Sequence, residues 1–148
     1  MYSCGRLLFL LRRYSDRYPV RQEHLSRVYH HENSIDGYDE ISLTGDFKVA
    51  TNSYERIFSP SDLGLRKALP EELVAGATEH EAAEIFDAVL ENRALQAQKD
   101  IVIANAAFGI QTFERGKKSI EECIAIARES LESGKALATF KKFREINS

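Results

Sequence analysis

Hydrophobic and polar residues follow a helical period through the second half of the chain. After Gly76, apolar residues recur at spacings of three and four, which indicates helices that each bury one face. The pattern predicts helices over residues 78–91, 96–115 and 119–133, and a last one from Lys135. The second helix is apolar almost all round in its middle, so we expect it to be buried on most sides. The last helix is expected to bury Leu137, Phe140 and Phe143.

Two of these helices begin with a capping box, in which a Ser or Thr and a Glu three residues later bond each other's backbone amides. Thr78 with Glu81 begins the first helix, and Ser119 with Glu122 begins the third. Cys123 falls on the apolar face of the third helix, where we expect a buried structural thiol. Local signals are therefore sufficient to place the starts of both helices.

Shorter elements are predicted before the helices. Ile41 and Leu43 alternate with polar residues, which is typical of a short strand or an extended loop. Residues 47–51 and 54–58 predict two short strands joined by a tight turn. The overall order is two or three short strands followed by four helices.

Residues 1–33 form a poorly specified leader. They carry six Arg and no Lys, and neither a helical stripe nor a strand alternation persists through them. This bias favours either a phosphate-binding arm or a truncated, divergent or frameshifted leader, and the stretch directly before Asp36 is a poor strand. We therefore expect residues 34–148 to form the folded segment.

Composition narrows the functional classes. The chain is 43% hydrophobic and 29% charged with a net charge of −3, which is typical of a soluble globular domain and argues against nucleic-acid binding. Its longest apolar run, Leu7–Leu11, is too short for a membrane span or a secretory signal, so we expect a cytoplasmic location and no membrane. The two cysteines form no CxxC pair or Cys/His cluster, which argues against a zinc site.

Candidate chemistry concentrates in one acidic turn. Asp36, Asp39 and Glu40 lie within five residues, beside Gly37. Such carboxylates either form a solvated turn or supply the oxygen ligands that Mg²⁺ prefers. The sequence contains no plausible Ser/His/Asp set and no glycine-rich phosphate loop, so no catalytic residue is assigned. Asn105, in the apolar part of the second helix, is expected to be a core amide bonded to a neighbouring backbone group.

The acidic turn is part of a longer motif. Residues 36–45 read D-G-Y-D-E-I-S-L-T-G, which resembles the D-G-x-D-E-I-S-x-x-G segment in the C-terminal half of anthranilate phosphoribosyltransferases. Four further segments resemble landmarks of that family in the same order: 58–65, 76–90, 100–107 and 119–136. The resemblance covers residues 34–143, and the first segment favours this family over the pyrimidine-nucleoside phosphorylases, which share the fold.

The resemblance implies the C-terminal part of the phosphoribosyltransferase α/β domain. It also implies transfer of phosphoribose from phosphoribosyl pyrophosphate to anthranilate in tryptophan biosynthesis. In that family the D-E pair binds Mg²⁺, which holds the diphosphate; the corresponding residues here are Asp39 and Glu40. Magnesium held in this way neutralises charge that develops on a polyanionic leaving group. Asp36 matches no ligand position and is expected to be a turn residue.

Other landmarks of the family precede this motif, and the sequence contains none of them: the helical domain, the GTGGD loop, the KHGNR segment and the anthranilate-contacting residues. We therefore expect a C-terminal fragment that is inactive alone, with its substrate-binding residues unassigned. The family dimerises mainly through the helical domain, so no dimer is assumed. The alternative is a non-catalytic relative that binds nucleic acid or a partner chain through its basic leader.

Overall fold

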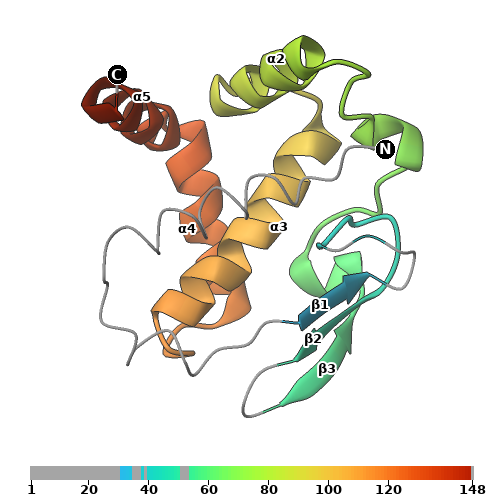
Figure 1. Ribbon diagram of the computed structural model, residues 1–148. Helices are drawn as coiled ribbons and strands as arrows, with labels where there is room; N and C mark the ends of the chain where they lie inside the picture. The colour runs from blue at the N-terminus through green and yellow to red at the C-terminus, as the bar shows by residue number, and fades with distance from the viewer. Residues whose placement is uncertain (1–30, 35–37, 39, 51–53, 148) are drawn as a thin grey trace.

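The computed structural model describes residues 31–34, 38, 40–50 and 54–147. In this part of the chain a three-stranded sheet is followed by two short 3-10 helices and four α-helices (Figure 1). The α/β class predicted from the sequence is confirmed. The 3-10 helices are η2 (Pro60–Leu63) and η3 (Pro70–Leu73).

The sheet has the order β1-β2-β3, and both pairings are antiparallel. Its strands are β1 (His31–Ser34), β2 (Phe47–Ala50) and β3 (Glu55–Phe58). Strands β2 and β3 are the pair that the sequence predicts. Strand β1 departs from the prediction, since three of its residues belong to the expected leader and its sequence lacks apolar alternation. It forms through antiparallel backbone pairing with β2, with His31 opposite Ala50.

A loop with bends at residues 40 and 43–45, not a strand, occupies residues 40–46 between β1 and β2. Ile41 and Leu43 are fully buried, as their apolar character predicts. Ser42 and Thr44 are also buried, and their hydroxyl oxygens lie 2.8 Å apart in a hydrogen bond. The alternation of apolar and polar residues therefore does not separate core from solvent in this loop.

The four helices agree with their predicted ranges to within two residues. Both capping boxes are confirmed: the Glu81 amide donates to Thr78 Oγ1 at 3.2 Å, and the Glu122 amide donates to Ser119 Oγ at 3.2 Å. None of the helices in the described residues is both long and apolar enough to cross a membrane. The bounds are α2 (Glu79–Leu90), α3 (Gln96–Phe113), α4 (Ile120–Glu132) and α5 (Lys135–Asn147).

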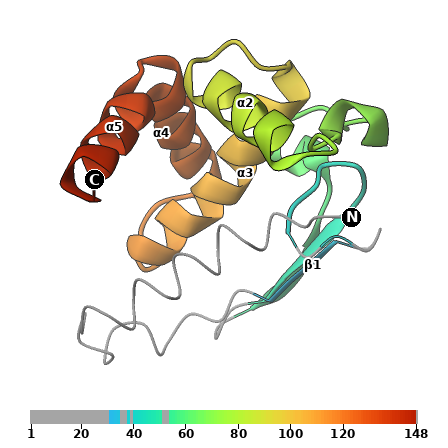
Figure 2. The same cartoon turned by 45° about the horizontal axis from the view of Figure 1, so that its top comes forward.

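One hydrophobic core joins the sheet to α3 and α4. Figures 1 and 2 show the sheet on one side of α3 and α4 on the other. The Phe47 and Phe58 rings stack with centroids 5.8 Å apart, and Phe108 of α3 meets them edge-on at 6.0 and 5.6 Å. Cys123 of α4 is completely buried, and this burial raises the pKa of its thiol. The prediction of a buried structural cysteine is confirmed.

The middle of helix α3 is buried on most sides, as its sequence predicts, but one face of the helix is exposed. Ile103 and Ala107 are buried against the core, but the Val102 side chain is 43% exposed and that of Phe113 is 84% exposed. The apolar run thus belongs to a helix with one uncovered face, because no described element packs there.

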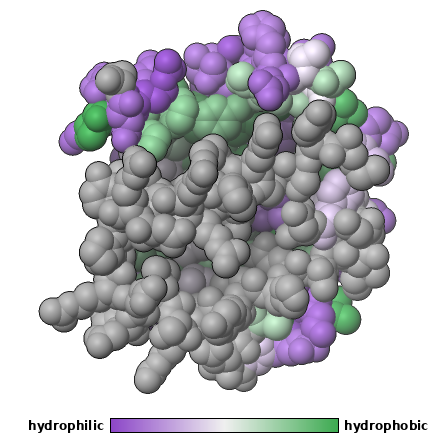
Figure 3. Space-filling view, viewed as in Figure 1, coloured by the Kyte–Doolittle hydropathy of each residue, from purple (hydrophilic) through white to green (hydrophobic). Residues whose placement is uncertain are grey.

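Helix α5 also packs less deeply than expected. None of its residues is fully buried, and Phe143 is exposed. Phe140 is half-buried and meets Phe86 of α2, with ring centroids 5.0 Å apart. Figure 3 shows hydrophobic surface between α2 and α5, below the polar outer side of α2. The predicted burial of this helix is therefore correct only in part.

Candidate functional site

The acidic pair singled out by the sequence lies at the edge of the described structure. Asp36 and Asp39 fall outside the described residues, whereas Glu40 is described and half-buried. Within the described ranges, no group of three or more His, Cys, Asp or Glu side chains could hold a metal ion. The chemistry of the acidic pair nevertheless fits Mg²⁺, which binds one or two protein carboxylates and completes its shell with water and phosphate.

Asn105 connects the loop after Glu40 to helix α3. Its Nδ2 donates to the carbonyl oxygens of Ile41 and Ile101, both at 2.9 Å. The Ile41 amide in turn donates to Asn105 Oδ1 at 3.3 Å. The prediction that backbone groups satisfy this amide is confirmed, and Asn105 is partly buried. The sequence pattern does not reveal that one of these backbone groups directly follows Glu40, 64 residues earlier in the chain.

A second long-range hydrogen bond holds the same loop. Leu43 is buried with φ at 59°, a left-handed conformation that is rare for a residue with a branched side chain. Its carbonyl oxygen accepts a hydrogen bond from the Ala68 amide at 2.9 Å. The backbone after Glu40 is therefore fixed by long-range bonds at two points. No sequence signal marks Leu43 as special.

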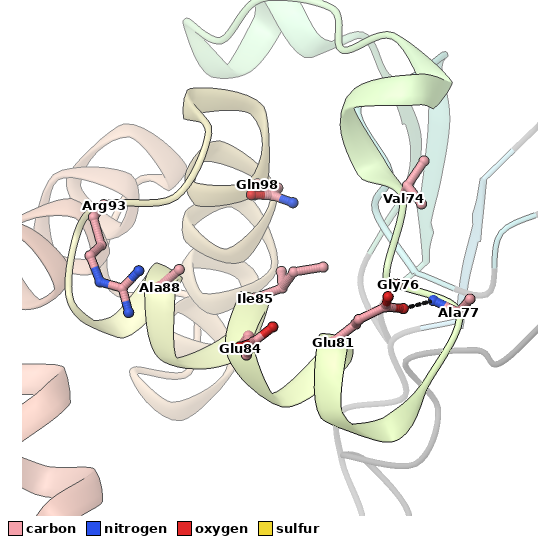
Figure 4. A pocket seen from close by; sticks show the side chains of 9 residues that line it. All are labelled: Val74, Gly76, Ala77, Glu81, Glu84, Ile85, Ala88, Arg93 and Gln98. Carbon is pink, nitrogen blue, oxygen red and sulfur yellow. Dashed lines mark hydrogen bonds between the residues drawn. The ribbon is translucent and has the colours of Figure 1, made fainter.

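A pocket among the described residues lies elsewhere. It has a volume of about 700 Å³ and opens between α2, the segment before it and the start of α3 (Figure 4). Figure 4 shows the Glu81 carboxylate pointing to the Ala77 amide, at 2.6 Å. The other charged groups also have local partners: Glu84 lies 3.4 Å from His80, and Arg93 pairs with Glu91. We therefore do not place the functional site in this pocket.

A comparison with protein families shows which family the chain belongs to. The model described as "Glycosyl transferase family, a/b domain" matches residues 24–137. The chain belongs to this glycosyl transferase family. The match begins within the segment expected to be a leader and includes the whole acidic turn, both capping boxes and Asn105.

Curated members of the family with high similarity are named anthranilate phosphoribosyltransferase. The protein from Phocaeicola vulgatus is 62% identical over 116 residues, which cover 78% of this chain and 35% of that protein. The protein from Bacteroides thetaiotaomicron is 50% identical over 139 residues, covering 94% of this chain and 40% of that protein. The resemblance seen in the motifs is confirmed. The chain spans well under half the length of these relatives.

Solved structures of the glycosyl transferase family agree with the fold. The anthranilate phosphoribosyltransferase of Thermus thermophilus superposes with a TM-score of 0.66 and 27% identity, over 76% of this chain and 33% of that chain. The Saccharomyces cerevisiae enzyme in complex with PRPP and Mg gives a TM-score of 0.65 at 23% identity, over 76% of this chain and 32% of the other. The alternative of a nucleic-acid-binding relative gains no support from these comparisons.

Proposed function

We propose that the chain is the metal-binding C-terminal portion of an anthranilate phosphoribosyltransferase. The complete protein would transfer phosphoribose from phosphoribosyl pyrophosphate to anthranilate in tryptophan biosynthesis, in the cytoplasm. The 148-residue chain itself is expected to bind magnesium and diphosphate without turning over anthranilate.

The acidic motif carries this proposal, and the names of the relatives support it. The segment 36–45 has the family's acidic motif, and relatives 62% and 50% identical to the chain are named for this activity. The structure adds support at the one acidic residue of the pair that it describes. Glu40 is half-buried, and the backbone of the next residue is hydrogen-bonded to α3. The main chain directly after the Glu40 carboxylate is therefore held in place.

Asp39 and Glu40 would hold the metal ion. Two adjacent carboxylates supply hard oxygen ligands and leave other positions of the octahedron for water and phosphate oxygens. Bound magnesium supplies charge neutralisation for a pyrophosphate leaving group. The chain's own contribution is to supply two negative ligands, one of which, Glu40, directly precedes a backbone segment fixed to α3.

Isothermal titration calorimetry tests the proposal. Preformed magnesium pyrophosphate is titrated into the 148-residue chain and into the double variant Asp39→Asn/Glu40→Gln. We expect the unsubstituted chain to bind and the double variant to lose this binding, because the amides keep the shape of the side chains but remove their charge.

A matched control distinguishes the loss of metal-binding carboxylates from the change in net charge. Glu71→Gln/Asp87→Asn changes the net charge equally at two exposed positions outside the loop, and binding should persist. Equal loss in both double variants would contradict a specific site. Salt-sensitive DNA binding that survives the change at Asp39 and Glu40, but not removal of residues 1–33, would instead support the nucleic-acid-binding alternative.

A further inference from the structure

Asn105 is partly buried, and its side chain bonds both backbone groups of one residue in the loop after Glu40. Its oxygen and nitrogen bond the N–H and the C=O of the same residue, Ile41, at 3.3 and 2.9 Å. The side chain thus takes the place of a neighbouring strand for one residue of the loop. A third bond, to the Ile101 carbonyl at 2.9 Å, ties the amide back to its own helix.

These bonds matter to Ile41 because that residue is completely buried. A buried backbone N–H or C=O without a partner is strongly unfavourable, so nearly all such groups in folded proteins are paired. No strand pairs with residues 40–46 in the described structure. Asn105 therefore supplies bonds to both backbone groups of Ile41 that a sheet would otherwise provide.

The loop also carries backbone strain two residues further on. Leu43 has φ at 59°, and its carbonyl oxygen is held by the Ala68 amide at 2.9 Å. Strained residues persist where the surrounding structure over-determines their conformation, and they concentrate at functional sites. Anchors at Ile41 and Leu43 fix the path of the chain directly after Glu40.

We propose that Asn105 is a positioning residue for the magnesium site, acting through the Ile41 backbone on the placement of the Glu40 carboxylate. This inference rests on the proposed function of Asp39 and Glu40. It assigns to helix α3 a role in metal binding although Asn105 itself is not a ligand.

The test measures two properties of the same variant. In Asn105→Ala, hydrogen exchange of the Ile41 amide, followed by NMR without metal, should accelerate. The dissociation constant for magnesium pyrophosphate, measured by calorimetry on the full chain, should rise about tenfold, as for residues that orient metal ligands elsewhere. If Asn105→Ala does not fold, the same two measurements are made on Asn105→Ser. One hydroxyl group cannot replace both the donor and the acceptor of the amide, so the same changes are expected.

Gln111→Ala is the matched control, since Gln111 is a partly buried amide on the same helix that donates to the Lys118 carbonyl, outside the loop. Its dissociation constant should equal that of the unsubstituted chain. Faster exchange at Ile41 with unchanged affinity would overturn the positioning role and leave the proposed function intact. If Gln111→Ala weakens the binding of magnesium pyrophosphate equally, the positioning role is also overturned, because the loss then reflects general destabilisation of the protein. No binding by the unsubstituted chain would overturn the proposed function, and the inference with it.

Discussion

Arg66, in the segment after η2, and Glu72 of η3 form a two-point ion pair. The guanidinium donates to both carboxylate oxygens, at 2.5 and 2.9 Å, and the Leu69 amide donates to the same carboxylate at 2.9 Å. The hydrogen bonds from Arg66, reinforced by the bond from Leu69, lower the pKa of Glu72 from 4.5 to about 2. Sequence spacing does not predict this pair, because the segment has no regular period.

This pair predicts a pH-dependent contribution to stability. A carboxyl group with a lowered pKa stabilises the fold above its unfolded value of 4.5, and this contribution disappears as the pH falls towards about 2. Glu72→Gln should therefore be less stable than the unsubstituted chain at pH 7, with the difference shrinking below pH 4.5. Thermal unfolding between pH 7 and pH 3 measures the effect.

The neighbouring exposed carboxylate serves as its control. For Glu71→Gln, the difference in stability from the unsubstituted chain should not shrink as the pH falls. An NMR titration in which Glu72 protonates near 4.5 in the folded protein would contradict the assignment.

Helix starts are the features of single elements that the sequence predicts best. A capping box needs only residues three apart, and both boxes form as predicted. Gly76 adds a local requirement before α2: its φ is 80°, and a Cβ atom there would lie 2.6 Å from Cβ of Glu81. Glu81 in turn accepts bonds from the Ala77 and Thr78 amides, which lower the pKa of its carboxyl group.

The cap of α4 gives a prediction at this scale. Ser119→Ala removes the acceptor of the Glu122 amide and should lower the free energy of unfolding by about 1 kcal/mol. Ser119→Asn keeps a capping acceptor and should stay close to the unsubstituted chain. Urea denaturation measures both variants, and equal losses would show that the cap bond does not contribute.

Strand β1 shows where prediction from single elements fails. The sequence of residues 31–34 has no strand pattern, and the strand exists because β2 lies beside it. Helix α3 shows a related limit, since its pattern correctly predicts burial on most sides but does not identify the face with Val102 and Phe113 as the exposed one. Both outcomes depend on which elements become neighbours.

The whole molecule depends on the contact between the sheet and α3. Phe108 meets Phe47 of β2 and Phe58 of β3, so one side chain joins the two layers. Phe108→Ala should lower the free energy of unfolding by about 3–5 kcal/mol, through lost burial and the cavity left behind.

The same helix offers a matched phenylalanine. Phe113 is 84% exposed, and Phe113→Ala should change the free energy of unfolding by no more than about 0.5 kcal/mol. Denaturant unfolding compares the two variants. A similar small loss at both positions would mean that the aromatic cluster does not couple the sheet to the helices.

The sequence by itself determined the helices, the caps, the hairpin strands, the buried thiol and the acidic motif. These features depend on residue types a few positions apart, so the pattern along the chain contains them. Only the tertiary structure decided the pairing of β1, the burial of Ser42 and Thr44 and the open face of α3. It also decided that the amide of Asn105 bonds the backbone after Glu40. These features are contacts between distant residues, and folding brings those residues together only when all the elements pack.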